Sequence, residues 1–131
     1  MADLDRSEKI TINLSPVDLG QIDLLVREGF YANRTDFIRT AIRTQLATQS
    51  RAIEQTVARR TLVLGIQHFS RADLEQIRAA GQTVRIKVLG LATIADDVSP
   101  ELAAQTIAEI EVLGAFRASA AVKAALASRI V

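Results

Sequence analysis

The chain has 131 residues, of which 49% are hydrophobic and 24% charged, a balance typical of a globular protein with a buried core. Because it contains no cysteine, disulfides and thiolate metal sites are excluded. Its 16 Lys and Arg against 15 Asp and Glu exclude binding of nucleic acid through net charge alone, so any such contact must be local. The polar N-terminus lacks the apolar segment of a signal peptide, and no later stretch is apolar for long enough to cross a bilayer. We therefore expect a soluble, cytoplasmic protein with no membrane partner.

Residues 8–15, EKITINLS, alternate apolar and polar side chains and predict a short strand. Its apolar face consists of Ile10, Ile12 and Leu14. Its polar face consists of Lys9, Thr11 and Asn13. The residues that follow read as helix and offer no second strand, although a lone short strand is unstable because its backbone groups lack partners. The partner must therefore come from elsewhere.

Two helices are predicted after this strand. Ser15 is placed to cap the first helix, which has Pro16 at its first position and spans roughly residues 16–28. Asn33 is placed to cap the second helix. Apolar residues recur at helical spacing at Leu19, Ile22, Leu25 and Val26 in the first helix and at Phe37, Ile38, Ala41, Ile42 and Leu46 in the second. No Gly or Pro occurs between Gly29 and Gly65, so the second helix is expected to continue past Leu46 through Ile53 and Val57.

One strand and two helices with apolar stripes provide too little surface to bury within one copy. A dimer provides both the missing strand partner and the missing apolar contact surface. In it, the strands of the two copies pair antiparallel into a ribbon that covers four interlocking helices. The strand's partner is then the same strand of a second copy. The dimer core is expected to contain Ile10, Ile12, Leu14, Ile22, Phe37, Ile38 and Ile42.

The segments KITINLS and REGFYANRTDFIRTAIR resemble the ribbon-helix-helix DNA-binding proteins of the MetJ, Arc and CopG class, over about residues 7–48. The resemblance implies an intertwined β-α-α dimer whose outward ribbon residues enter the major groove of double-stranded DNA. By position, the residues that contact bases are Lys9, Thr11 and Asn13. Taken singly, these residues also fit the solvated face of an ordinary strand, but the whole arrangement favours the DNA-binding interpretation.

The resemblance also implies phosphate contacts at the start of the second helix, which corresponds here to Asn33, Arg34 and Thr35. Exposed amides and the helix dipole favour an anion at such a position. Arg6 is placed to add a positive charge beside the ribbon.

Residues 61–131 contain three similar units that each read as a short strand ending in VLG, a loop and a helix. The units are TLVLGIQHFSRADLEQI, IKVLGLATIADDVSPELAAQTI and IEVLGAFRASAAVKAAL. Strands joined by helical crossovers are parallel, so we expect a small α/β domain with a parallel sheet. The three helices are expected to begin at Ser70, Ser99 and Ser119.

Aligning Gly65, Gly90 and Gly114 places Arg85 beside Glu109 and Lys87 beside Glu111, which supports in-register stacking. Helices on one side of the sheet would leave Leu64, Leu89 and Leu113 near its other side, with both outer strands as unpaired edges. We therefore expect this half to associate with copies of itself.

Catalysis has little support in the sequence. His68 is the only histidine, and no nucleophile, phosphate-binding or dinucleotide-binding motif occurs. Asp96, Asp97 and Glu101 carry the charge to hold a cation, but a solvated loop entering a helix explains them more simply. Nickel-responsive repressors share the layout, yet their His- and Cys-rich ligand set is missing. We expect no enzyme activity, no cofactor and no metal.

The sequence therefore predicts a DNA-binding domain at residues 1–50, a helical connector at 51–60 and an α/β self-association domain at 61–131. The pattern favours a sequence-specific transcriptional repressor that binds double-stranded DNA and itself. Two alternatives stay open: an antitoxin that holds a toxin partner, and a DNA-anchored scaffold or partition protein that polymerises.

Overall fold

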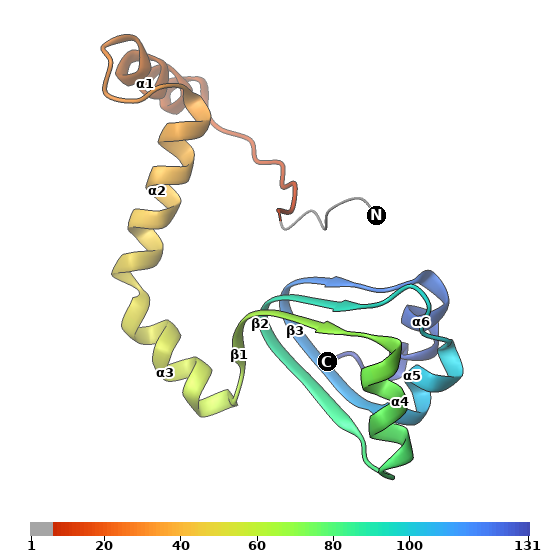
Figure 1. Ribbon diagram of the computed structural model, residues 1–131. Coiled ribbons are helices and arrows are strands. Elements are labelled where there is room, and N and C mark those ends of the chain that lie inside the picture. The colour runs from red at the N-terminus through yellow and green to blue at the C-terminus, as the bar shows by residue number, and fades with distance from the viewer. Residues whose placement is uncertain (1–6) are drawn as a thin grey trace. The chain divides into compact units, whose positions relative to one another are not determined.

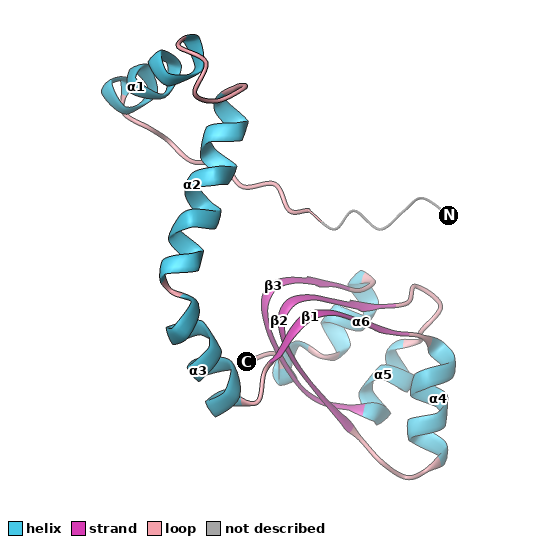
Figure 2. Cartoon of the chain, turned by 60° about the vertical axis from the view of Figure 1, so that its left-hand side comes forward, coloured by secondary structure: helices cyan, strands magenta, loops and turns pink. Residues whose placement is uncertain are grey.

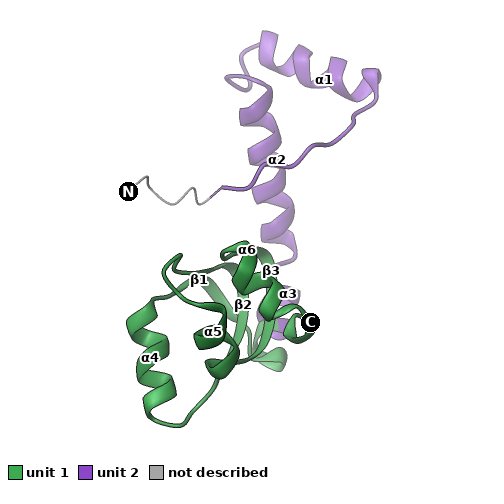
Figure 3. Cartoon of the chain, turned by 90° about the vertical axis from the view of Figure 1, so that its right-hand side faces the viewer, with its two compact units in different colours: residues 1–6, 57–131 green, residues 7–56 purple. Residues whose placement is uncertain are grey.

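The computed structural model describes residues 7–131, so the predicted phosphate contact at Arg6 lies outside the described residues. The chain divides into two compact units, residues 7–56 and 57–131 (Figure 3). The boundary falls inside a helix, α3 (Ser50–Arg60), which contains the predicted connector. Within residues 7–131, no helix has the length and apolar character needed to cross a membrane.

The first unit contains helix α1 (Pro16–Arg27) and helix α2 (Arg34–Thr48), which begin at the predicted caps. The Ser15 side chain accepts a hydrogen bond from the Asp18 amide at 3.1 Å. The Asn33 side chain accepts one from the Asp36 amide at 2.8 Å. Each cap satisfies an amide that the first helical turn leaves without an intrahelical acceptor.

The expectation that α2 runs on through Ile53 and Val57 was wrong, because these residues lie in the separate helix α3. The Thr48 hydroxyl donates at 2.6 Å to the Gln45 carbonyl, the group that the Gln49 amide would bond in a continuous helix. The Gln49 amide bonds the Leu46 carbonyl instead, at 3.1 Å. The last turn tightens and the helix ends.

Residues 7–15 belong to no helix and form no strand pairing within the described part of a single chain. A strand is defined by a partner backbone, and the predicted partner is a second copy. The ribbon therefore stays a prediction about two chains.

The second unit is built around three parallel strands, β1 (Val63–Phe69), β2 (Val84–Ile94) and β3 (Ile107–Arg117), in the order β1-β2-β3. Helices α4 (Arg71–Ala79), α5 (Pro100–Thr106) and α6 (Ala120–Ala125) follow the strands in turn, before a short 3-10 helix at Ala127–Arg129. All three helices begin at the predicted caps, Ser70, Ser99 and Ser119. The predicted parallel sheet is thus confirmed.

The predicted register is also confirmed. Gly65, Gly90 and Gly114 are Cα partners across the sheet. Arg85 pairs in register with Glu109, and Lys87 with Glu111. Glu111 makes a further ion pair with Arg60, at the end of α3.

The three mid-strand glycines have backbone angles that other residues rarely adopt, with φ of 136° at Gly65, 144° at Gly90 and 120° at Gly114. A Cβ atom on Gly90 would lie 2.1 Å from the Gly65 carbonyl oxygen, and one on Gly114 would lie 2.1 Å from the Gly90 carbonyl oxygen. Glycine inside a strand commonly marks a bend and a close approach of backbones. Figure 2 shows the three strands bending together.

The three helices that follow the strands pack on one face of the sheet (Figure 1). The core between them contains Leu74, Ile86, Val88, Leu102, Ile107, Ile110, Val122 and Leu126. Strand alternation places Leu64, Leu89 and Leu113 on the other face. Leu64 is 70% exposed and Leu113 44% exposed.

The expectation of two unpaired sheet edges was wrong for β3. Ile130 forms an isolated bridge with Ile110, and the Val131 amide donates to the Ile110 carbonyl at 2.8 Å. The C-terminal residues therefore cover part of that edge. For β1, the described residues provide no strand on its outer side.

Candidate nucleic-acid interface

The predicted base-contacting side chains are Lys9, Thr11 and Asn13, and all three are exposed in the described chain. They alternate with Ile10 and Ile12, whose side chains are 74% and 59% exposed. In one chain both faces of this segment thus meet solvent. Burial of the apolar face therefore requires a partner, and the opposite polar face would then stay available for a ligand.

The start of α2 combines a reciprocal cap with first-turn amides that have no acceptor within the helix. Asn33 accepts from the Asp36 amide, and the Asp36 carboxylate accepts from the Ala32 amide at 2.9 Å. The amides of Arg34 and Thr35 lie in the first turn, where no preceding helical carbonyl reaches them. Such amides bind phosphate well. The Asn33 side chain is engaged in capping, so a phosphate contact at Asn33 would use its backbone amide, and the predicted contacts at Asn33, Arg34 and Thr35 stay a prediction.

The Arg34 side chain forms a bidentate ion pair with Asp23, with Nε to Oδ1 at 2.7 Å and Nη2 to Oδ2 at 2.9 Å. The hydrogen bonds from this guanidinium hold the pKa of the Asp23 carboxyl below its usual range. The pair ties α1 to the first turn of α2. Sequence reasoning missed it, since a contact across the turn at Gly29 follows no helical spacing.

The predicted dimer core is mostly uncovered in a single chain. Of its members, only Ile22 is buried, while Phe37 and Ile38 are half-buried and Leu14 and Ile42 are exposed. Leu14, Ile22, Leu25 and Phe37 help to line a groove of about 350 Å³. Exposed apolar side chains beside such a groove mark an interaction surface.

The turn between the helices is fixed by an aromatic contact. The ring of Tyr31 packs edge-on against the ring of Phe37, with centroids 5.0 Å apart. This arrangement is a favourable one for two aromatic rings. It holds the turn against the first turn of α2, where the amides of Arg34 and Thr35 lie.

Comparison with known proteins gives a family assignment. No match was found among curated proteins or among solved structures. The sequence model of the ribbon-helix-helix transcriptional regulator family matches residues 5–123. This match confirms the resemblance at the N-terminus, and it extends well beyond the predicted limit at residue 48 to include most of the strand-helix repeats. The chain therefore belongs to the ribbon-helix-helix transcriptional regulator family.

Proposed function

We propose that the protein is a transcriptional repressor that binds operator DNA as a ribbon-helix-helix dimer. The observation that carries the proposal is the segment 8–15, with an exposed apolar face that one chain cannot cover and an exposed polar face of Lys9, Thr11 and Asn13. An antiparallel ribbon of two copies buries the first face on the helices. It presents the second face to the major groove, which is wide enough to admit a two-stranded ribbon.

The chemistry of the polar face suits base recognition. Lys9 donates to the acceptors of guanine, Asn13 pairs its amide with adenine, and Thr11 offers a hydroxyl and a methyl group. The amides of Arg34 and Thr35 bind phosphate and set the register of the ribbon along the duplex. A repressor then acts by occupying the operator and excluding other proteins.

Replacing Thr11 or Asn13 with Ala should weaken specific DNA binding by roughly 1 to 3 kcal/mol for each base contact removed. The dimer should stay folded, because both side chains lie on the solvent face. Gel shifts with operator and unrelated DNA measure the change, and Thr44→Ala, on the exposed surface of α2, serves as the control. A Thr11→Ala, Asn13→Ala double variant that binds operator as tightly as wild type would show that the ribbon does not read the bases.

We further propose that residues 61–131 join DNA-bound dimers, with residues 1–50 as the DNA-binding domain and 51–60 as the connector. Support comes from the sheet face that carries Leu64, Leu89 and Leu113, on which Leu64 is largely exposed. Contiguous exposed apolar surface marks interaction sites. Joined dimers engage neighbouring operators at a raised effective concentration.

A fragment of residues 1–50 should therefore bind a single operator but lose cooperativity on adjacent operators. Avidity can exceed single-site affinity by about 10² to 10⁴, and this gain should disappear. The full chain with Leu64→Asp should behave like the fragment, because it places a charge in the proposed contact. Gel shifts on one and two operators at two salt concentrations measure the effect, since phosphate-driven binding falls as salt rises. Equal cooperativity in the fragment and the full chain would contradict this role.

The two alternatives are less well supported. Antitoxins commonly hold their toxin with a tail that folds on binding, whereas residues 57–131 have a closed core of their own. A scaffold that polymerises through head-to-tail contacts needs two different complementary surfaces on each copy. The C-terminal residues cover part of the β3 edge, which favours a closed contact between copies over an open array.

A further inference from the structure

The outer edge of β1 has no neighbouring strand among residues 7–131, whereas Ile130 and Val131 cover part of the opposite edge of the sheet. Natural edge strands commonly carry a lysine, a proline or a bulge, which prevents pairing with another chain. The sequence of β1, VLGIQHF, contains no charged residue and no proline. All seven residues of β1 pair with β2 in an unbroken register, so no bulge turns the edge away. The backbone of this edge is therefore available to a further strand.

The central strand shows how the side chains of β1 would be buried by a strand on each side. Val88 of β2 is in register with Val63, and Leu91 of β2 is in register with Ile66. With a strand on both sides, Val88 and Leu91 are 0% and 6% exposed, whereas Val63 and Ile66 are 43% and 50% exposed. A strand on the outer side of β1 would thus bury apolar surface that one chain leaves in water.

The bend of the sheet restricts which strand fits against β1. Gly65, Gly90 and Gly114 are in register and have φ between 120° and 144°, so the three strands bend along one line (Figure 2). Paired strands keep a spacing of about 4.8 Å, so a partner for the whole of β1 must bend along the same line. Among the strands of the described residues, β2 is internal and the edge of β3 is partly covered. The matching partner that this chain supplies is β1 of a second copy.

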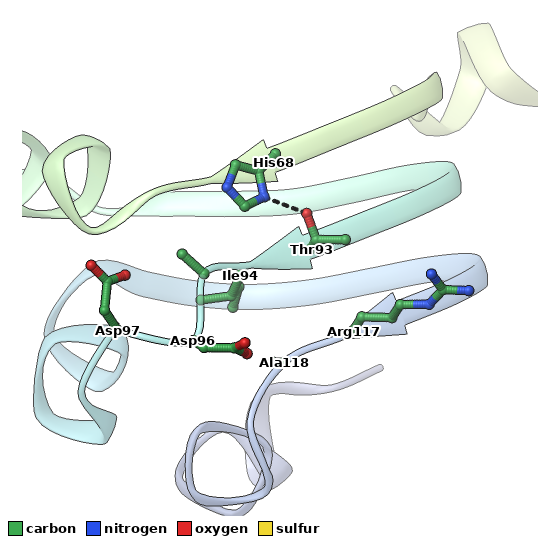
Figure 4. A pocket seen from close by; sticks show the side chains of 8 residues that line it. His68, Thr93, Ile94, Asp96, Asp97, Arg117 and Ala118 are labelled. Atoms are coloured by element: carbon green, nitrogen blue, oxygen red, sulfur yellow. Dashed lines mark hydrogen bonds between the residues drawn. The ribbon is translucent and has the colours of Figure 1, made fainter. Parts of the chain in front are cut away.

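The inner side of β1 is already held in place at its carboxyl end. A cavity of about 560 Å³ there is lined in part by His68, Thr93 and Arg117, which are in register across the three strands (Figure 4). Nδ1 of His68 lies 2.5 Å from Oγ1 of the buried Thr93. This hydrogen bond directs the imidazole towards β2 and away from the outer edge. An edge that is ordered beforehand loses little conformational entropy when it pairs.

We propose that the β1 strands of two copies pair antiparallel around a two-fold axis at Gly65, which joins two three-stranded sheets into one of six strands. A closed contact between identical edges has two-fold symmetry, and this symmetry makes the two strands antiparallel. An axis along the bisector of the bend maps the bend of one sheet onto that of the other. Leu64 then lies directly opposite the partner's Ile66. The contact rests on the proposed self-association of residues 61–131, and it specifies the surface, the symmetry and the register.

Disulfide formation in the full chain tests the register, because the chain contains no cysteine of its own. Leu64→Cys protein mixed with Ile66→Cys protein should form a disulfide on oxidation, since Cβ atoms directly opposite lie about 4.5 to 5.5 Å apart. Leu64→Cys protein alone should not, because the two copies of this residue lie about 7 to 8 Å apart on a diagonal, beyond the reach of a disulfide. Leu64→Cys mixed with Leu113→Cys is the matched control. These two leucines would meet if β1 paired head to tail with β3 of another copy, so we expect no disulfide between them.

Sedimentation of the full chain without DNA tests the edge by a second route. Wild type should form assemblies larger than the ribbon dimer. Ile66→Lys places a charge on the edge, and its two copies in each contact should raise the dissociation constant of these assemblies about 100-fold, about tenfold for each lysine. Its thermal midpoint should stay close to that of wild type, because Ile66 is half exposed. Val131→Lys adds the same charge at an exposed position beside β3, and it should assemble as wild type does.

The outcomes separate this contact from the proposals on which it rests. The edge contact is overturned if Leu64→Cys and Ile66→Cys form no mixed disulfide, if Leu64→Cys bonds Leu113→Cys instead, or if Ile66→Lys assembles as tightly as wild type. In the last two cases the self-association of residues 61–131 stands and uses another surface. A wild-type chain that stays a ribbon dimer at every concentration would remove the self-association and the edge contact together. Binding of Ile66→Lys to a single operator should equal that of wild type, so the repressor proposal is tested separately.

Discussion

Changing Ile12 to Asp is expected to abolish folding and dimerisation of the N-terminal unit together. Ile12 is 59% exposed in one chain, but in the proposed dimer it lies beneath the ribbon. A carboxylate there would be buried without a partner, and an uncompensated buried charge costs several kcal/mol. Sedimentation of residues 1–56 and their helix content by circular dichroism measure the loss.

Thr11→Asp is the matched control, since it places the same charge one residue away on the opposite face of the strand. This variant should remain a helical dimer and lose DNA binding through repulsion from phosphate. The pair of variants therefore separates folding from recognition. A dimeric Ile12→Asp protein with normal helix content would show that the strand faces are assigned wrongly.

Replacing Gly90 with Ala should have the largest effect in the C-terminal unit. The new Cβ would lie 2.1 Å from the Gly65 carbonyl oxygen, at a backbone φ of 144°. Strain at such a φ alone costs about 1 to 3 kcal/mol, and the backbone clash adds to it. We expect the free energy of unfolding of this unit to fall by roughly 4 kcal/mol or more. Faster hydrogen exchange of the strand amides measures the fall.

Gly65→Ala is the control for Gly90→Ala. Gly65 has a similar φ of 136°, but a Cβ there meets no atom within 4 Å. Gly65→Ala should therefore lower the free energy of unfolding only by the backbone strain, about 1 to 3 kcal/mol. If the two variants were equally stable, the close approach of neighbouring strands at the glycines would not be a determinant of this sheet.

Local signals predicted most of the architecture. Each predicted capping residue caps the helix that it was expected to begin, because capping depends on a few neighbouring residues. These residues are Ser15, Asn33, Ser70, Ser99 and Ser119. The repeated VLG pattern predicted a parallel sheet and its register. Register follows from the repeat because a slip of one residue would move every apolar side chain to the wrong face.

Other features depend on contacts that the sequence pattern does not encode. At the break between α2 and α3 the Thr48 hydroxyl bonds the Gln45 carbonyl, and neither Gly nor Pro marks the position in the sequence. The ion pair between Asp23 and Arg34 crosses a turn, so no helical spacing reveals it. The cavity brings together His68, Thr93 and Arg117 from three strands. Of these, only His68 was considered from the sequence, where it was attributed no role.

The central claim is that a symmetric ribbon reads the major groove. Methylation protection on DNA selected by the full chain from a random pool tests it directly, because guanine N7 lies in the major groove and adenine N3 in the minor groove. We predict protection of guanine N7 at two symmetry-related half-sites of an inverted repeat, with adenine N3 between them still reactive. Protection confined to adenine N3, or selected DNA without two-fold symmetry, would contradict the account.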